Sequence, residues 1–335
     1  MRRYWRAMVS RLTLRARRGP IGIGIVGVGG WGMHNAAAVM RSRRFTVRQV
    51  CDVREGAARR FADRYGTGWC ARPEDMFARP DVACVALTVP NPLHGSMVRA
   101  AADAGKHVFV EKPLDVRADE CRALGDYCRE RSVVLMVGHQ LRREPAVRAM
   151  KRLIEAGQVG RPLFAAGVRT VPRPPGGWRR DAQACPFGSM EQLGSHLVDA
   201  MIYLFGPAVG GSGTSCNIPF RADGPEWGFL RLCFADDIWA TVTSSYSAPN
   251  RLHLELTGEE GVLLSDGRSL RCVSRGGSAA VPTPGPDGSV AQFIEFADCI
   301  EGGGQVETDA GNSAAVAEAM ALMGRSDAAD DDRPG

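Results

Sequence analysis

The fold is decided by residues 21–32, which read IGIGIVGVGGWG. An apolar run leads into a G-x-G-x-x-G spacing from Gly27 to Gly32, and a helical pattern around residues 34–40 follows. The spacing alone is common in glycine-rich chains, so its position between a strand and a helix carries the argument. That arrangement lets the backbone approach a pyrophosphate at a helix N-terminus. It predicts a dinucleotide site formed by Gly27, Gly29, Gly30, Trp31 and Gly32.

The type of dinucleotide depends on Asp52, which ends a second apolar run at residues 47–51. A carboxylate at this distance from the glycine turn can hold the ribose diol of NAD. It would repel the 2′-phosphate of NADP, so NAD is the expected cofactor. NADP stays open as the alternative, because Arg54 could accept that phosphate if Asp52 turned aside.

Strands and helices alternate from residue 20 to residue 140. The helices show i, i+3, i+4, i+7 spacing, as in Ala58, Phe61, Ala62 and Tyr65, and a second helix carries Val98, Ala101 and Ala102. The apolar runs expected to be strands are residues 21–26, 47–51, 82–89, 107–110 and 133–137. This alternation predicts an N-terminal Rossmann domain with a doubly wound parallel sheet.

The pattern changes after Pro145, and residues 141–325 are expected to form a C-terminal α/β domain. Helices are predicted at residues 146–156, 189–205, 290–301 and 310–323, and strands at residues 163–171, 229–234 and 238–244. These short strands with turn signals favour a large, open, mostly antiparallel sheet with helices on one face.

The charge of the chain is uneven. Residues 1–18 hold seven arginines and no acid; without them 35 basic residues face 37 acidic ones, although the formal net charge is +5. The near-neutral body gives no indication of a nucleic-acid partner, and no apolar run of about 18 residues predicts a membrane span. Residues 1–19 are expected to be a disordered basic extension, with an arm to a partner subunit as the alternative. Residues 326–335 are expected to be a disordered acidic tail.

The ten cysteines are scattered singly, without a C-x-x-C pair or Cys/His pairs at metal spacing. Cys84, Cys233 and Cys299 lie in apolar runs, where cysteine acts as a small hydrophobic residue. We therefore expect reduced thiols in a cytoplasmic protein, and no metal site.

Lysine is rare in this chain: only Lys106, Lys112 and Lys151 stand among 42 basic residues. Lys112, in the sequence VEKPL, follows an apolar strand at the carboxyl edge of the predicted sheet, where ligands bind. Arginine cannot release a proton near neutral pH, whereas a partly buried lysine can. Lys112 is therefore a candidate for proton transfer, and a solvated loop lysine is the alternative.

The helix expected at residues 189–205 carries a polar line on an apolar background. Gln192, His196, Asp199 and Tyr203 stand at i, i+4, i+7 and i+11. Because the rest of the helix is hydrophobic, this line is expected to face a ligand or a wet cavity. A histidine with its hydrogen bonds satisfied in the core is the alternative for His196.

Taken in order, GVGGWG, Asp52, TVPNPLH, VEKPL, GHQLRREPAVRAMK and LGSHLVD resemble the glucose–fructose oxidoreductase/inositol dehydrogenase/MocA (Gfo/Idh/MocA) family. The resemblance covers roughly residues 21–325. It implies a Rossmann domain, a C-terminal α/β domain whose open sheet makes homodimers or homotetramers, and substrates such as sugars, cyclitols and nucleotide sugars.

Carried over by position, the resemblance implies roles for individual residues. Lys112 would lie beside the reacting carbinol, and His196 would be the catalytic histidine. Arg142 and Asp199 would be on the substrate side. The residues implied to border the cofactor are Thr88, Pro90, Asn91, His94 and Glu111, in addition to those of the glycine turn, Asp52 and Arg54.

The chain departs from the family pattern at Gln192, where the common pattern has an aspartate four residues before the histidine. A glutamine can orient a hydroxyl but cannot stabilise an imidazolium by charge. This puts the usual Lys–Asp–His proton relay in question, rather than cofactor binding. Glu191 is a weaker substitute, because it stands one residue round an α-helix from Gln192.

The expected activity is NAD(P)-dependent hydride transfer between nicotinamide and a secondary alcohol or ketone of a sugar-like substrate. The alternatives are a redox-neutral NAD-using glycosidase or epimerase of the same fold, and a non-catalytic ligand sensor. Arg173, Arg179 and Arg180 could meet a phosphate or carboxylate of a nucleotide sugar, or could belong to a solvated loop.

Overall fold

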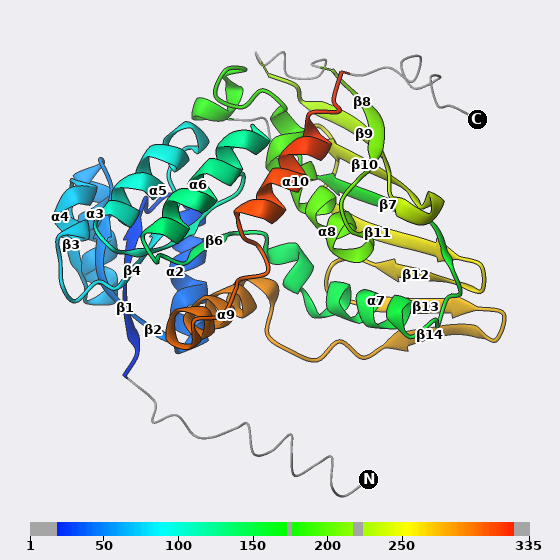
Figure 1. Cartoon of the computed structure of the whole chain (residues 1–335), viewed down its shortest axis with the longest axis horizontal. Helices are drawn as coiled ribbons and strands as arrows, with labels where there is room; N and C mark the ends of the chain where they lie inside the picture. The colour runs from blue at the N-terminus through cyan, green and yellow to red at the C-terminus, as the bar shows by residue number, and fades with distance from the viewer. Residues whose placement is uncertain (1–18, 173–175, 217–223, 325–335) are drawn as a thin grey trace, which may run out of the picture.

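The computed structural model describes residues 19–172, 176–216 and 224–324. The predictions for residues 1–18, for Arg173 and for the acidic tail therefore lie outside the described residues. Two sheets, each with its own helices, stand side by side along the long axis of the molecule (Figure 1). No helix in these ranges is both long enough and apolar enough to cross a membrane.

The first sheet is parallel and has the strand order β3-β2-β1-β4-β5-β6. Its strands are β1 (Ile21–Val26), β2 (Phe45–Cys51), β3 (Gly68–Cys70), β4 (Cys84–Leu87), β5 (His107–Val110) and β6 (Leu135–Val137). Each of the longer strands begins or ends within three residues of a predicted apolar run. Only β3 has no predicted counterpart, and its three residues are too short to show a period.

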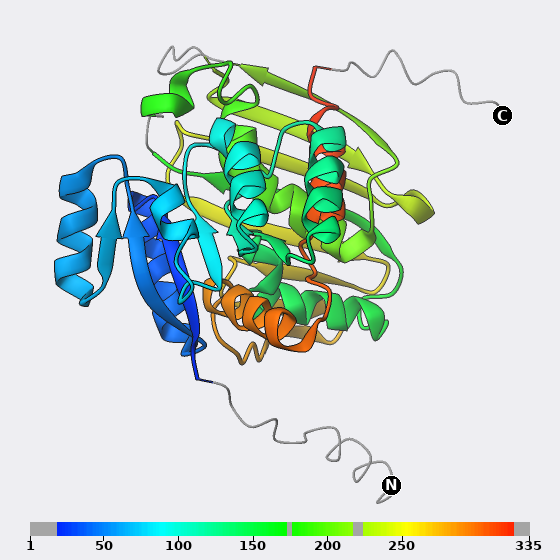
Figure 2. The ribbon, with the colours of Figure 1, turned by 60° about the vertical axis from the view of Figure 1, so that its left-hand side comes forward.

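The helices of this domain are α2 (Gly30–Ser42), α3 (Glu55–Tyr65), α4 (Pro73–Phe77), α5 (His94–Asp103) and α6 (Ala118–Glu130), with a 3-10 turn η1 (Asn91–Leu93) before α5. They cover the sheet (Figure 2). In α3, the buried residues are Ala58, Phe61 and Ala62, which belong to the predicted apolar face. The doubly wound Rossmann fold expected from the sequence is thus confirmed.

The second sheet has eight strands in the order β14-β13-β12-β11-β7-β10-β9-β8. They are β7 (Pro162–Thr170), β8 (Gly210–Cys216), β9 (Trp227–Cys233), β10 (Trp239–Ser245), β11 (Arg251–Gly258), β12 (Gly261–Ser265), β13 (Leu270–Ser274) and β14 (Gly277–Val281). Only β7 and β10 pair in parallel, and every other neighbouring pair is antiparallel. The mostly antiparallel sheet predicted for this domain is confirmed.

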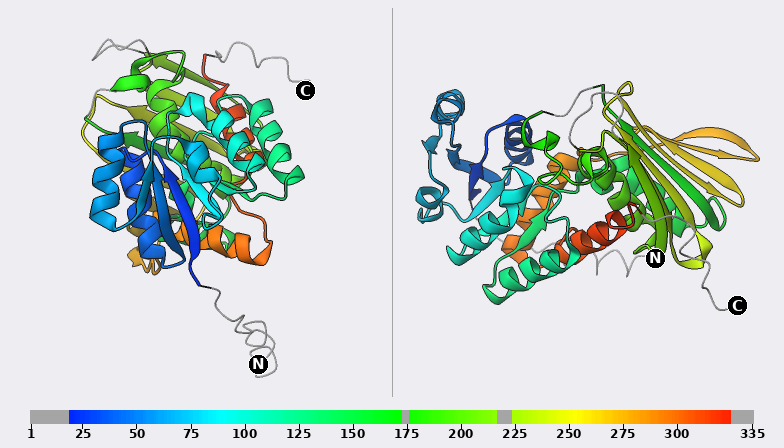
Figure 3. Two further views of the ribbon diagram at one scale, coloured as in Figure 1. Left: turned by 90° about the vertical axis from the view of Figure 1, so that its left-hand side faces the viewer. Right: turned by 90° about the horizontal axis from the view of Figure 1, so that it is seen from above.

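One face of this sheet is covered by α7 (Pro145–Glu155) and α8 (Ser195–Phe205), and no helix of the described chain covers the other face (Figure 3). The burial alternates along the strands: in β9, Leu230 and Leu232 are buried, while Arg231 between them is only partly buried. The buried positions pack on Leu197 and Met201 of α8. Such alternation is the sign of a sheet with one packed face.

The last two helices return to the first domain, although they follow the second sheet in the sequence. Phe293 of α9 (Gly288–Gly302) packs on Phe109 of β5, with ring centroids 4.5 Å apart. At α10 (Ala310–Met320), a Cβ on Gly125 of α6 would approach the Cβ of Ala310 to 2.5 Å, so the two helices pack closely. The packing ties α9 to the Rossmann core, while the predicted domain boundaries stay predictions.

Candidate active site

The glycine turn at the end of β1 can form only because the side chains are absent. Gly27 has φ of +89°, and a Cβ there would lie 2.7 Å from the carbonyl oxygen of Thr88. A Cβ on Gly32 would lie 1.9 Å from the carbonyl oxygen of Gly27. Helix α2 then starts after Gly29 without a side-chain cap, so its first N–H groups remain free. Free N–H groups at a helix N-terminus fit a pyrophosphate.

Asp52 stands at the end of β2 beside this turn. Its carboxylate accepts hydrogen bonds from the backbone N–H of Val28 (3.0 Å) and from the backbone and Nε of Arg54 (2.9 and 3.1 Å). Burial opposes ionisation, but the hydrogen bonds from Arg54 hold the pKa of Asp52 below its ordinary value. The pair presents an ionised carboxylate for a ribose diol and an exposed guanidinium that could meet a 2′-phosphate. The residues therefore fit a nicotinamide dinucleotide.

The segment after β4 makes its hydrogen bonds mainly to backbone carbonyls of the protein, including those of the glycine turn. Thr88 Oγ1 donates to the carbonyl of Val26 (2.9 Å) and also to that of Gly27. His94 is fully buried, and its two ring nitrogens lie 2.7 Å from the Pro113 carbonyl and 3.0 Å from the Val89 carbonyl. Both ring nitrogens of His94 thus face backbone carbonyls inside the protein, and its predicted place beside the cofactor stays a prediction.

Pro90 and Asn91 lie at the start of η1, close to the next functional element. Asn91 Nδ2 donates to Glu191 Oε1 at 2.6 Å. Behind them, Asn35 Nδ2 of α2 donates to Glu111 Oε1 at 2.7 Å, and burial raises the pKa of Glu111. The first contact joins η1 to the segment before α8, and the second joins α2 to the residue after β5.

Lys112 follows β5 and is buried, with 5% of its surface exposed. Its Nζ donates to the carbonyl of Gln192 at 2.7 Å and lies 3.5 Å from that of Glu191. Burial lowers the pKa of Lys112 to about 8, and the carboxylates of Glu111 and Glu191 oppose that shift. The other ionisable groups around Lys112 are Arg179, Cys185 and the imidazoles of His94, His139 and His196.

The helix predicted at about residues 189–205 is present over that range, but it contains a π turn that the sequence did not predict. Residues Met190–Gly194 form this turn, in which the N–H of Ser195 bonds to the carbonyl of Met190, and the α-helical part α8 begins at Ser195. Bonding from i to i+5 widens the helix locally by one residue. Gln192 still borders the large cavity together with His196, whereas Glu191 is buried and borders a second, smaller cavity. The structure thus places Gln192, and not Glu191, on the cavity side with His196.

His196 is half-buried and borders a large cavity. Loss of hydration and the nearby Lys112 lower the pKa of His196 well below its ordinary value. Its Nδ1 is buried and has no hydrogen-bond partner among the described residues. Gln192 borders the same cavity, and its Oε1 accepts from Arg179 Nε at 3.3 Å. A neutral imidazole has one ring nitrogen that can accept a hydrogen bond from a hydroxyl.

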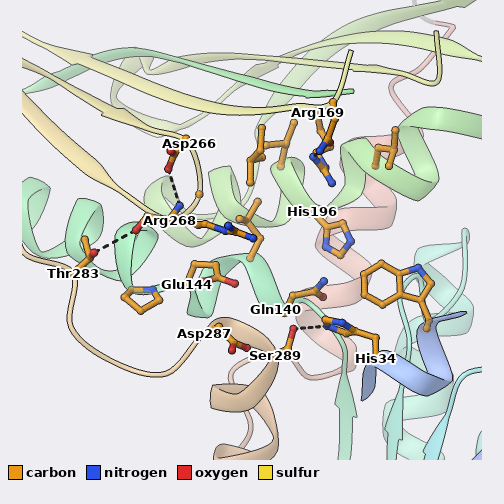
Figure 4. A pocket seen from close by; sticks show the side chains of 18 of the residues that line it. His34, Gln140, Glu144, Arg169, His196, Asp266, Arg268, Thr283, Asp287 and Ser289 are labelled. Atoms are coloured by element: carbon orange, nitrogen blue, oxygen red, sulfur yellow. Dashed lines mark hydrogen bonds between the residues drawn. The ribbon is translucent and has the colours of Figure 1, made fainter. Parts of the chain in front are cut away.

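The cavity has a volume of about 920 Å³ and lies between α2 and the helix-covered face of the second sheet (Figure 4). Trp31 and His34 of α2 form its wall on the side of the glycine turn, and His34 Nε2 lies 2.8 Å from Ser289 Oγ. Its size is at the upper end of the roughly 300–1,000 Å³ typical of small-molecule sites.

Arg142 and Asp199 do not border this cavity. Asp199 is fully buried, and its Oδ2 accepts from Arg142 Nε at 2.9 Å while its Oδ1 accepts from Arg142 Nη2 at 2.5 Å. Tyr203 points to Arg148, whose Nη1 donates to its hydroxyl at 2.9 Å. The polar line expected on this helix is thus divided: Gln192 and His196 face the cavity, whereas Asp199 and Tyr203 face other helices. A contact of either residue with substrate would require the ion pair between Arg142 and Asp199 to break. The predicted substrate contacts of these two residues stay a prediction.

Two further residues lie near the site. The sequence ranks Glu191 only as a weaker substitute for the family aspartate, and it makes no prediction for Arg169. Arg169 lies at the end of β7 near His196, and its charge contributes to the low pKa of that imidazole. Its place in an apolar strand pattern could have drawn attention, since an arginine is unusual on a buried face. In the described ranges no group of three or more His, Cys, Asp or Glu side chains could hold a metal.

Comparisons with known proteins agree with this site. Residues 21–139 match the oxidoreductase family with an NAD-binding Rossmann fold, and residues 147–264 match the GFO/IDH/MocA C-terminal domain. The chain is 27% identical over 301 residues to D-xylose 1-dehydrogenase (NADP(+)) of Haloarcula marismortui, with 84% of each chain covered. It is 29% identical over 259 residues to scyllo-inositol 2-dehydrogenase (NAD(+)) of Bacillus subtilis, with 71% of each covered.

A solved structure has the same fold. Levoglucosan dehydrogenase in complex with NADH and levoglucosan superposes with a TM-score of 0.82 at 23% identity, over 90% of this chain and 96% of that chain. Together these matches span both sheets, and the class they define is that of NAD(P)-dependent oxidoreductases. The chain belongs to the Gfo/Idh/MocA family, as its sequence motifs indicate.

Proposed function

We propose that this oxidoreductase moves a hydride between nicotinamide and a secondary alcohol or ketone of a sugar, cyclitol or nucleotide sugar. The observation that best supports this is that a buried lysine, with a pKa of about 8, lies close to the neutral imidazole of His196, which borders a large cavity. The dehydrogenases named above act on xylose and scyllo-inositol, which supports the substrate class.

Under this proposal the cofactor lies along the carboxyl edge of the first sheet. The free N–H groups after Gly29 would hold the pyrophosphate, and Asp52 would hold the adenosine ribose. When bound, the dinucleotide supplies a carbon that accepts or returns hydride. Arg54 leaves NADP open as the alternative cofactor.

Lys112 and His196 both contact the substrate hydroxyl in this scheme, with different roles. In the oxidative direction the neutral amine of Lys112 takes the proton of the substrate hydroxyl, and the neutral imidazole of His196 orients that hydroxyl by accepting a hydrogen bond. The carbonyls of Glu191 and Gln192 fix the position of Lys112 Nζ. The same groups return the proton in the reductive direction.

Glu191 is proposed as the positioning acid in place of the family aspartate. Its carboxylate is 2% exposed, is fixed by Asn91 and raises the pKa of Lys112. It thereby limits how far burial can lower that pKa. Gln192 then lies on the cavity side of the turn, where its neutral amide can form a hydrogen bond to the substrate.

The compartment and the assembly belong to the same proposal. The ten cysteines are all free thiols, which supports a reducing compartment such as the cytoplasm. The face of the second sheet without helices exposes Phe164 of β7 to 43%, which supports a homodimer or homotetramer through that sheet.

The experiment that tests the proposed function is a panel of sugars, cyclitols and nucleotide sugars with NAD and NADP. Substrate-dependent formation of reduced cofactor, followed by its absorbance, is expected with at least one member. Turnover of a substrate without net reduced cofactor would support a redox-neutral enzyme instead. Binding without any turnover would support a sensor.

A further inference from the structure

The cavity extends well beyond His196, toward the hairpin loop between β12 and β13 and the segment before α9. Asp266, Gly267 and Arg268 form its wall on one side, and Thr283 and Asp287 form it on the other (Figure 4). These residues are far along the chain from the proposed proton-transfer groups, and the proposed function assigns them no role.

The acidic side chains of this wall are satisfied within the protein. Asp287 accepts from Arg41 Nη2 at 2.5 Å and from the backbone N–H of Val290 at 3.1 Å. Asp266 accepts from the backbone N–H groups of Arg268 (2.9 Å) and Ser269 (2.7 Å), and these bonds lower the pKa of Asp266.

Glu144 is the third acid. Burial raises the pKa of Glu144, although a backbone hydrogen bond from Gly288 and the charge of Arg268 oppose the shift. Each of the three acids thus already interacts with an arginine or with backbone N–H groups of the protein.

Arg169 has no such partner. Its Nη1 donates to two neutral oxygens, Asn250 Oδ1 at 2.9 Å and the carbonyl of Arg251 at 3.3 Å. Within the described ranges it forms no ion pair, and no group accepts from its Nε or Nη2. Burial lowers the pKa of Arg169, and no neighbouring acid opposes that shift. A partly desolvated guanidinium without a counter-ion is costly unless a ligand supplies one.

Arg268 is the second cation on this wall. Its side chain reaches into the cavity (Figure 4), and it makes no side-chain hydrogen bond or ion pair within 4.0 Å to any described residue. The third arginine of the cavity, Arg41, is already paired with Asp287. Arg169 and Arg268 thus present guanidinium N–H groups that no carboxylate of the described residues contacts within 4.0 Å, although Glu144 is near enough to interact with the charge of Arg268.

We propose that Arg169 and Arg268 form a subsite for an anionic substituent of the substrate, so that the enzyme selects acidic sugars over neutral ones. The shared chemistry is a carboxylate or a phosphate ester, which guanidinium groups bind through charge-assisted and often bidentate hydrogen bonds. Because Arg169 lies near His196, the anion would sit close to the reacting carbinol. This inference rests on the proposed function, since it names the substrate class of the same cavity.

The test measures binding and turnover separately. D-gluconate, D-glucuronate, D-glucose 6-phosphate and D-glucose are titrated into the full chain with NADH present, by calorimetry, and the same compounds are assayed for turnover with NAD. The native enzyme is expected to bind at least one acidic sugar about tenfold or more tightly than D-glucose. The carboxylates and the phosphate ester separate the two sources of the anion.

The variants Arg169→Gln and Arg268→Gln remove one charge each. Both are expected to lower the ratio of acidic to neutral sugar affinity by about tenfold, and Arg169→Lys should recover part of it. The matched control is Arg161→Gln, because Arg161 stands just before the same strand but is exposed and paired with Glu259. If Arg169→Gln does not fold, the exposed Arg268 still provides the test.

Equal binding of acidic and neutral sugars by the native protein would overturn the subsite, and so would variants that keep the native ratio. Failure of the proposed function looks different. In that case no compound reduces NAD, while the calorimetric preference for acidic sugars can still be measured. Turnover of neutral sugars without that preference would remove the subsite alone.

Discussion

The substitution of Lys112 is the perturbation with the clearest expected outcome. Lys112→Arg keeps a positive charge and most of the reach but replaces a titratable amine by a guanidinium that stays protonated. Lys112→Met removes the charge and keeps an unbranched apolar chain. A lysine that only holds a charge would tolerate arginine, whereas one that carries a proton would not.

The magnitude follows from the burial of the amine. A pKa of about 8 instead of 10.5 increases the neutral fraction at pH 7 about 300-fold, to roughly one tenth of the molecules. That gain lies within the roughly 10²–10⁴-fold that general acid–base catalysis contributes. Both variants are therefore expected to slow hydride transfer by 10²-fold or more, while NAD affinity changes little.

The sign of the pH dependence also follows. The neutral amine is present above the pKa, so oxidation should rise toward a plateau through about pH 8, and reduction should fall over the same range. Both changes of rate with pH should be absent in Lys112→Arg and Lys112→Met. Glu191→Gln keeps an oxygen for Asn91 but removes a charge that raises the pKa of Lys112, so the rise in the oxidation rate should move to lower pH by on the order of one unit.

The assay is single-turnover hydride transfer in native and variant proteins across pH, with NAD binding measured in parallel. Near-native transfer in both Lys112 variants would refute the reasoning and leave His196 as the proton acceptor. If Glu191→Gln leaves the pH dependence of the oxidation rate unchanged, the charge of Glu191 does not raise the pKa of Lys112.

Three further predictions concern neighbouring residues. Asp52→Ser should narrow the preference for NAD over NADP, and tenfold tighter binding of NADP by the native protein would contradict the assignment. Gln192→Asp should raise the pKa of His196 and shift the pH optimum without abolishing turnover; an unchanged pH profile would count against that coupling. Asp199→Asn should destabilise the fold by about 3–5 kcal/mol, because it leaves the guanidinium of Arg142 buried without a charge partner, and a denaturant titration with no such loss would contradict the structural role.

The parts of the site that sequence predicts are those fixed by the local chain. The glycine turn, Asp52 and Lys112 each follow a strand, and the ends of parallel strands meet at one edge of a sheet. Their places along the chain therefore suffice to bring them together. The sequence also predicts His196, because an imidazole on an otherwise apolar helix indicates a functional role.

The remaining parts depend on the phase of a helix and on contacts across the chain. The segment before α8 contains one π turn, and no residue pattern indicates that the turn will be π rather than α. Arg169 meets the site only because β7 ends beside α8. The return of α9 to the first core depends on Phe293 and Phe109, which are far apart in the sequence.

The most direct test of hydride transfer uses sugars and cyclitols that carry deuterium on the carbinol carbon. The native enzyme and NAD are incubated with each compound, and the reduced cofactor is analysed by mass spectrometry. If the account is right, NADH formed with at least one compound carries one deuterium, and Lys112→Arg forms it at least 10²-fold more slowly. If NAD binds but no compound gives deuterated NADH, the central claim is contradicted.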